Sequence, residues 1–271
     1  MATVPAPALR RERPPPDLGA IAARRRTLLC QIGVGLALIV AWQLAAALFG
    51  DRWISRPTLV AVRLWSWLGG DLYRHLATTL AEVFAGIGIG LPIGAALGLW
   101  LGRSPFAGSL LRPFVVALYS IPLVTLAPLF VMWFGLEMRP KIIMISVVVC
   151  LIVFFNTFRG AQSVDEDLVN SLKIMGSRGR ETFVKIVLPA SMAWIMSGLK
   201  IALPYSLVAA TVGEMLAART GIGWLISKAA SQFDITALYA ALVVLMVLGL
   251  CFSKAATSIE QWFLRWRHVS Q

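Results

Sequence analysis

Acidic residues are scarce in this sequence. Only 13 of its 271 residues are Asp or Glu, charged residues of both signs make up 14% of it, and 58% of the chain is hydrophobic. A soluble domain is about a quarter charged, because its surface must be solvated. The composition therefore excludes an ordinary soluble domain and predicts an all-α polytopic membrane protein, whose partner over most of its surface is the lipid bilayer.

Cysteine and histidine are also rare. The three cysteines, Cys30, Cys150 and Cys251, lie within apolar runs and show no CxxC or CxxH spacing. Neither His75 nor His268 has a metal-ligating or nucleophilic partner nearby in the sequence. We therefore expect no metal site, no disulfide framework and no cofactor.

The formal net charge of +12 raises the alternative of nucleic-acid binding. However, Lys and Arg stand at the ends of apolar runs and form no basic stripe, so we expect no nucleic-acid partner. The sequence also lacks a GxxxxGK[ST] phosphate-binding loop, and no Lys follows a Gly. We therefore expect no ATPase site and a non-catalytic chain; a polytopic membrane enzyme, which would need paired carboxylates, a His cluster or an activated Ser near a membrane face, is a less favoured alternative.

Six apolar runs reach roughly the 20 residues that a helix needs to cross a bilayer. A Pro- and Arg-rich stretch, 1–26, precedes them and is predicted to be a disordered cytoplasmic tail. The segment 51–74 combines Trp with charges and is predicted to be interfacial and extracytoplasmic, and 259–271 to be a second cytoplasmic tail. The six predicted spans are 27–50, 83–102, 113–136, 142–158, 186–213 and 235–253.

The distribution of basic residues predicts the orientation. Sixteen Lys and Arg fall on the side of the two termini and eight on the other side, and Lys200 lies within a span. Cytoplasmic loops are enriched in Lys and Arg, so both termini should be cytoplasmic in a bacterial cell (inner) membrane.

Glycine recurs at every fourth position of the second span. This spacing leaves one helix face without side chains for about five turns, so another helix can approach closely. A sliding surface for gating is the alternative interpretation. The glycines are Gly86, Gly90, Gly94, Gly98 and Gly102.

Prolines at positions 92, 122, 128 and 204 lie in the interior of predicted spans. Each removes a backbone hydrogen bond and can kink or break its helix. Pro122 and Pro128 are close together in YSIPLVTLAPLFVMWFG, which makes them candidates for the translocation pathway, although ordinary kinks are the alternative.

Lys200 is a cation inside a span, where burial of charge is costly. It attracts an anionic solute in one interpretation. In the other, it snorkels to the interface or pairs with a carboxylate such as Glu214.

A long polar segment, 159–189, separates the fourth and fifth spans. Acidic residues 165–167 favour a helix start, apolar Leu168, Leu172 and Met175 recur at spacings of four and three, and Gly176 favours a turn. The segment should therefore form a short amphipathic helix, a turn, and a second helical stretch that ends at residues 188–189.

Here the sequence resembles the permease subunits of binding-protein-dependent type I ABC importers. Their cytoplasmic loop carries EAA, three residues, G, a spacer and LP, and this chain matches it at Gly176, Leu188 and Pro189. The triplet falls on Asn170, Ser171 and Leu172, so the usual glutamate is replaced. The stretches YSIPLVTLAPLFVMWFG, FFNTFRGAQSVD, VLPASMAWIMSGLKIAL, VGEML and TGIGWLI resemble the nitrate, sulfonate and taurine branch.

The resemblance implies a transmembrane (type-1) domain over 75–258, with its coupling loop at 159–189. It also implies alternating access, driven by separate ABC ATPase subunits that bind the ATP, an extracytoplasmic solute-binding protein, a homodimer, and a small anion such as sulfonate, nitrate or taurine, or a related small molecule, as solute. A stand-alone secondary transporter or channel is the alternative. The implied coupling residues are Asp167, Leu168, Asn170, Ser171, Leu172, Met175, Gly176, Leu188 and Pro189, and the candidate pathway residues are Pro122, Pro128, Lys200 and Glu214.

Overall fold

The structure is a computed structural model that describes residues 18–50 and 53–263. Every regular element in these residues is helical, which confirms the all-α prediction. The chain divides into two compact units, Met1–Pro57 and Thr58–Gln271, and each is considered by itself. The ends of the two predicted tails, 1–17 and 264–271, lie outside the described residues.

The first unit contains one long helix, α1 (Leu18–Phe49). This helix begins inside the segment predicted to be a disordered tail, because the stretch LGAIAARRR consists mostly of good helix formers. Residues Leu29–Phe49 are long and apolar enough to cross a membrane. Gly50, with φ of 85°, follows the last turn, where its N–H donates to the carbonyl of Ala46.

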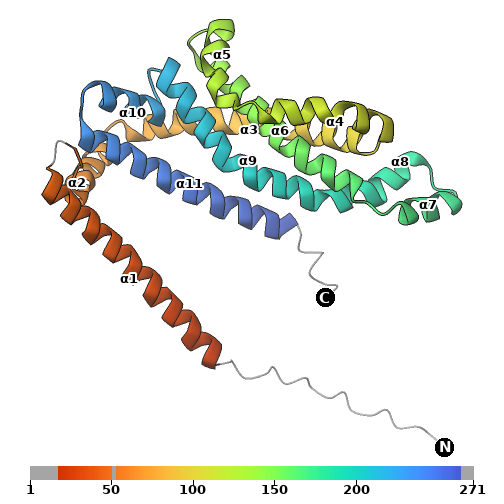
Figure 1. Cartoon of the computed structure of the whole chain (residues 1–271), viewed down its shortest axis with the longest axis horizontal. Coiled ribbons are helices and arrows are strands. Elements are labelled where there is room, and N and C mark those ends of the chain that lie inside the picture. The colour runs from red at the N-terminus through yellow and green to blue at the C-terminus, as the bar shows by residue number, and fades with distance from the viewer. Residues whose placement is uncertain (1–17, 51–52, 264–271) are drawn as a thin grey trace, which may run out of the picture. The chain divides into compact units, whose positions relative to one another are not determined.

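The second unit is a bundle of helices (Figure 1). Among the described residues of the whole chain, five helices could span a membrane, namely α1, α3, α6, the helix that continues into α9, and α11. The elements are α2 (Pro57–Leu68), α3 (Leu72–Gly102), α4 (Pro105–Ser120), a 3-10 turn (Leu123–Leu126), α5 (Ala127–Phe134), α6 (Met138–Gln162), α7 (Glu166–Ile174), α8 (Gly179–Thr182), a π-helical turn (Phe183–Val187), α9 (Leu188–Ala217), α10 (Ile222–Ser231) and α11 (Ile235–Phe263).

The continuous third span predicted over 113–136 is wrong. Helix α4 ends at Ser120, and a 3-10 turn separates it from the eight-residue α5. Pro122 lies at the break. It interrupts the helix because it has no N–H to donate and disfavours the helical conformation at the preceding residue. Pro128 stands in the first turn of α5, where no donor is needed. Pro92 and Pro204, in contrast, lie inside unbroken helices.

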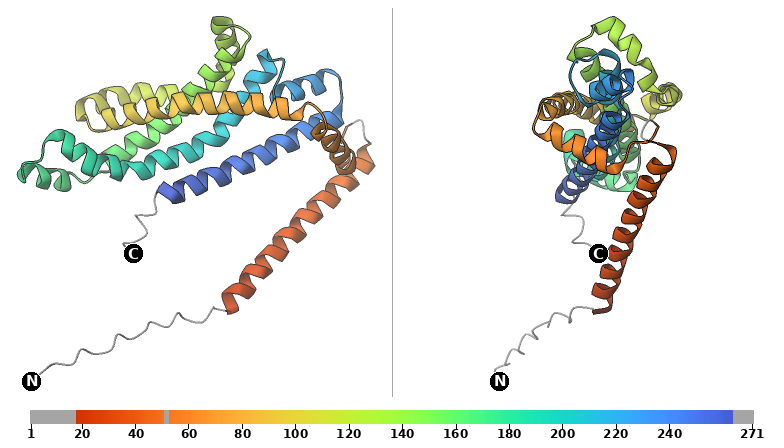
Figure 2. Two further views of the ribbon diagram at one scale, coloured as in Figure 1. Left: turned by 180° about the vertical axis from the view of Figure 1, so that it is seen from behind. Right: turned by 90° about the vertical axis from the view of Figure 1, so that its left-hand side faces the viewer.

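Helix α6 packs between α3 and α9 and forms the centre of the bundle (Figure 2). Along α3, Gly86 faces Ile145 and Gly102 faces Ala161, so α3 and α6 run parallel. Along α9, Gly213 faces Lys141, near the start of α6, so α6 and α9 run antiparallel. The segment between two parallel neighbours, 103–137, must therefore return along the length of the bundle.

The glycine face of α3 lies directly against α6. A Cβ at Gly98 would be 2.7 Å from the Cβ of Thr157, and one at Gly102 would be 2.6 Å from the Cβ of Ala161. At Gly94 it would overlap the carbonyl oxygen of Cys150 and lie 3.1 Å from the carbonyl carbon. Because backbone atoms block that position, the two helices could accept a side chain there only by moving apart.

We predict that Gly94→Ala lowers the free energy of unfolding by about 1–3 kcal/mol, because the added methyl group overpacks the α3–α6 contact. Gly88→Ala is the matched control on the same helix, since its Cβ would meet no neighbouring atom of the described chain within 4 Å. That change should be neutral or stabilising by up to about 1 kcal/mol, as expected for Gly→Ala in a helix. Thermal unfolding of both variants in mild detergent measures the difference, and equal midpoints would contradict the prediction.

Candidate coupling segment and buried polar network

Helix α7 and the turn after it have the form predicted from the sequence. The side chain of Asp165 accepts a hydrogen bond from the N–H of Asp167 at 2.8 Å, which satisfies a free donor of the first turn. After the helix, Gly176 has φ of 86°, and the N–H of Ser177 donates to the carbonyl of Leu172 at 3.0 Å. This is the usual arrangement of a glycine that ends a helix, and it confirms the helix and the turn.

One face of α7 attaches to the protein and the other is open. Val164 and Val169 are buried, whereas Leu168, Ile174 and Met175 are 56%, 88% and 81% exposed. The segment lies at the end of the bundle opposite α2 and α10 (Figure 1). It therefore presents three large apolar side chains at one end of the molecule, a pattern that marks interaction surfaces.

The triplet that replaces EAA lies along α7. Asn170 and Ser171 are exposed, and Leu172 is half-buried. The hydroxyl of Ser171 donates to the carbonyl of Asp167 at 2.8 Å. Further along, the hydroxyls of Ser177 and Thr182 share a hydrogen bond of 2.7 Å, which ties the turn after α7 to α8.

The prediction that a helical stretch ends at Leu188 and Pro189 is wrong. The chain passes from α8 through the π-helical turn and directly into α9, with Pro189 in the first turn of α9. Proline cannot donate to the carbonyl four residues earlier and its ring crowds that carbonyl, so the preceding turn widens instead of ending. Helix α8, the π-helical turn and α9 thus form one continuous helical path over Gly179–Ala217, and the turn at Gly176 separates it from α7.

A buried polar network lies at the other end of the bundle. His75, Thr79 and Glu82 share one face of α3 with the glycines that follow, and all three side chains are buried. They meet Glu214, near the end of α9, and the first residues of α10. Ionisable side chains in apolar helices need such partners, because their burial alone is costly.

Three successive N–H groups at the start of α10 bond to this network. Gly221 donates to Nδ1 of His75 at 3.0 Å, Ile222 to the hydroxyl of Thr79 at 3.0 Å, and Gly223 to Glu214 at 2.7 Å. The hydroxyl of Thr79 donates in turn to Glu214 at 2.6 Å. Side chains from two other helices therefore cap α10, in place of a local capping residue.

An ion pair completes the network. Lys141, at the start of α6, pairs with Glu82, and their side chains are 4% and 0% exposed. Glu214, also 0% exposed, lies close enough to both groups for their charges to interact. The Lys141–Glu82 pair therefore joins α6 to α3, and the hydrogen bond from Thr79 to Glu214 joins α3 to α9.

Lys200 and Glu214 are not partners. The ammonium of Lys200 donates to Glu260 on α11 at 2.8 Å, and the Lys200 side chain is 43% exposed. Both oxygens of Glu214 are bonded, to Thr79 and to Gly223. Pairing with a carboxylate is one of the interpretations of Lys200 drawn from the sequence. The partner is Glu260 and not Glu214.

Sequence reasoning missed Glu82, Lys141 and His75 as members of a site. The predicted spans began at residues 83 and 142, so these residues were placed in loops, whereas α3 begins at Leu72 and α6 at Met138. One signal was available, since Glu82 precedes Gly86 by four residues and Thr79 and His75 continue the same face. Nothing in the sequence indicated that residues 221–223 would meet this face.

Residues 90–265 match the model of a protein family described as binding-protein-dependent transport system inner membrane component. The matched region holds the coupling segment and, of the buried network, Lys141, Glu214 and residues 221–223. The chain belongs to this family. It is a multi-pass inner-membrane permease component of an ABC importer, and it is non-catalytic because the ATPase is a separate subunit.

Several relatives carry similar sequences over most of their length. The formylaminopyrimidine transport permease protein ThiX of Halalkalibacterium halodurans is 28% identical, over 86% of this chain and 93% of the relative. SsuC of Escherichia coli, whose name assigns it to aliphatic sulfonates, is 28% identical over 85% and 89%. The riboflavin transport system permease protein RibX of Chloroflexus aurantiacus is 29% identical over 85% and 87%.

Solved structures share the fold. A chain of a bacterial ABC transporter that imports the acidic polysaccharide alginate aligns with a TM-score of 0.61 at 16% identity, over 94% of this chain and 99% of that chain. A chain of the inward-facing MetNI methionine ABC transporter aligns with a TM-score of 0.56 at 18% identity, over 71% and 94%.

We predict that Lys141→Met lowers the free energy of unfolding by about 3–5 kcal/mol, because it leaves the Glu82 carboxylate buried without its partner. The double variant Glu82→Met/Lys141→Met removes both charges and should recover most of that loss. Thermal unfolding in detergent tests the pair. A double variant that is no more stable than Lys141→Met would show that the ion pair is not the reason for the loss.

We also predict that Thr79→Val lowers the free energy of unfolding by about 1–3 kcal/mol, because it removes the hydroxyl between Glu214 and the N–H of Ile222. Thr78→Val is the matched control, since the Thr78 hydroxyl bonds only to the carbonyl of Arg74 in its own helix. Comparable unfolding midpoints for the two variants would refute the capping role of Thr79.

Proposed function

We propose that this chain forms the solute pathway of an ABC importer by crossing the inner membrane six times, with both termini and the segment 159–189 in the cytoplasm. Five crossings correspond to the five long apolar helices. The sixth is the broken segment α4–α5, because α3 and α6 are parallel and the chain must return between them. The excess of Lys and Arg on the side of the termini and of α7 supports the orientation.

We assign the coupling to the ATPase to α7 and the turn at Gly176. The observation that carries this proposal is the exposure of Leu168 and Ile174 on α7 and of Met175 in the turn after it, while Val169 holds the helix to one end of the bundle. An amphipathic helix of this kind docks in an apolar groove of a partner. The groove belongs to an ABC ATPase subunit, since this sequence has no phosphate-binding loop of its own.

The complete machine would then contain two permease copies, two ATPase subunits and an extracytoplasmic solute-binding protein. Each ATPase of a pair needs one coupling segment and the chain carries one, so a homodimer is the simplest assembly. One solved relative is an alginate transporter in complex with a periplasmic protein, which supports the same layout here. ATP binding would close the ATPases, move the two coupling segments and alternate the access of the cavity.

The solute is proposed to be a small anion such as sulfonate, nitrate or taurine, or a related small molecule. The relatives are named for sulfonates, formylaminopyrimidine and riboflavin, so this part of the proposal rests on resemblance. That Pro122, Pro128, Lys200 and Glu214 line the pathway stays a prediction. The break at Pro122 would free carbonyls there to face a cavity.

We expect the tagged chain, purified in mild detergent, to bring down a P-loop ATPase in equal amount. Met175→Glu places a charge on the proposed contact and should reduce the recovered ATPase at least about tenfold, as expected for loss of an apolar anchor. Met175→Leu, at the same 81% exposed position, keeps the apolar surface and should retain the ATPase. Quantitative mass spectrometry of the purified complexes gives the ratio.

An equal amount of ATPase with both variants would exclude Met175 from the interface. Purification of the wild-type chain alone, with transport in liposomes that needs no ATP, would replace the importer mechanism with that of a secondary transporter.

A further inference from the structure

A cavity of about 410 Å³ opens at the end of the bundle opposite α7, between α2, the start of α3 and α10. Its lining includes three cations, Arg74, Arg219 and Lys228, and one carboxylate, Asp71. The size is within the range of small-molecule sites, and the charge of the lining is positive. The coupling segment lies at the opposite end of the bundle, so this cavity is not part of the proposed ATPase contact.

His75 supplies a hydrogen-bond donor to this cavity. Because its Nδ1 accepts the N–H of Gly221 at 3.0 Å, the neutral ring carries its proton on Nε2. His75 is 8% exposed and lines the cavity, and no described residue bonds to its Nε2. A donor that opens to a cavity and has no partner among the described residues is a group to which a ligand can bind.

The ring of His75 is fixed in place. Trp224 stacks on it with 5.2 Å between ring centroids and 12° between planes, and the ammonium of Lys228 lies 4.8 Å from the Trp224 ring. The Gly221 hydrogen bond sets the direction of the imidazole. A donor oriented on two sides in this way is preorganised, so a ligand would not have to order it.

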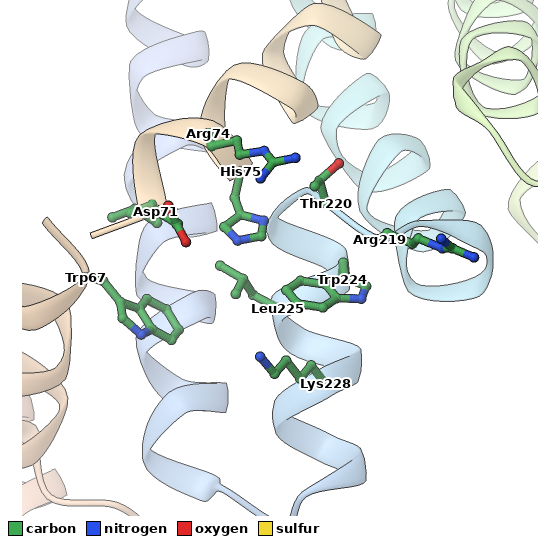
Figure 3. A pocket seen from close by; sticks show the side chains of 10 residues that line it. Trp67, Asp71, Arg74, His75, Arg219, Thr220, Trp224, Leu225 and Lys228 are labelled. Atoms are coloured by element: carbon green, nitrogen blue, oxygen red, sulfur yellow. The ribbon is translucent and has the colours of Figure 1, made fainter. Parts of the chain in front are cut away.

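One cation lies on each side of the His75 donor. Figure 3 shows His75, Trp224 and Leu225 between Arg74 on one side and Lys228 on the other, while Arg219 points away. Neither Arg74 nor Lys228 has a carboxylate partner within 4.0 Å in the described part of the chain. Two cations without a carboxylate partner and a fixed N–H donor match the charge and the several acceptors of an oxyanion.

We propose that this cavity binds an oxyanion group, a phosphate or a sulfonate, between Arg74, Lys228 and Nε2 of His75. Two sources carry this chemistry, a free small anion and the headgroup of an anionic lipid. The position at the end of the apolar α3, beside Trp67 and Trp224, is compatible with a headgroup. The site is independent of the ATPase contact proposed above, so either proposal can fail alone.

The first arm of the test uses the purified full chain in an uncharged detergent that contains no phosphate. Inorganic phosphate and methanesulfonate are titrated at constant ionic strength, with chloride as the balancing salt, while the unfolding midpoint is recorded. We expect both anions to raise the midpoint in a saturable way. Arg74→Gln and Lys228→Gln should each raise the apparent dissociation constant about tenfold or more, since each removes a charge-assisted contact.

Two control variants accompany this titration. Lys254→Gln removes an exposed cation from α11, which does not line the cavity, and should leave the affinity unchanged. Lys228→Arg keeps the charge and should restore much of the affinity, which separates loss of charge from misfolding.

The second arm compares nanodiscs of phosphatidylcholine alone with nanodiscs that contain phosphatidylglycerol. Stabilisation by phosphatidylglycerol that Arg74→Gln and Lys228→Gln both abolish would assign the site to a lipid headgroup, and saturable binding in the first arm alone would assign it to a free anion. The proposal is overturned if neither anion nor anionic lipid stabilises the wild-type chain, or if the stabilisation is the same in all variants.

Discussion

The close approach of α3 to α6 is the constraint on which the rest of the bundle depends. Glycine at every fourth position of α3 lets two backbones meet without intervening side chains, and lipid supplies no hydrophobic force that could replace this contact. Because the two helices run parallel, the connection between them must recross the bundle. The broken path through α4 and α5 is the consequence of that requirement combined with Pro122.

The same packing determines where charge can be buried. The glycine face ends at Gly86, and the next turns of the same face carry Glu82, Thr79 and His75 toward α6 and α10. The close contact that excludes water also removes hydration from these groups, so each needs a protein partner. Lys141 and the N–H groups of residues 221–223 provide them, and Gly221, with φ of 120°, allows the backbone to approach Glu214.

Local patterns made much of this structure predictable from the sequence. Three patterns depend only on neighbours within a few turns: glycine at every fourth position, the amphipathic stretch before Gly176, and the apolar runs. The corresponding helices are present. The buried network could not be predicted in this way, because His75 and Thr79 meet residues nearly 150 positions away. The prediction of a continuous third span over 113–136 was wrong for a local reason. Pro122 breaks the helix there, although the hydropathy of the segment favours a span.

Helix α9 gives the molecule a mechanical connection between its two ends. It has 30 residues, about 45 Å at 1.5 Å per residue, and it follows α8 and the π-helical turn without a loop, while the turn at Gly176 joins α8 to α7. Its far end carries Glu214, which holds the start of α10. If α7 couples to the ATPase as proposed, a displacement there would reach this rod through the turn at Gly176, and the widened turn before Pro189 is the point where the rod would bend. The hydrogen bond between Glu214 and Gly223 would then carry the motion of the rod to α10.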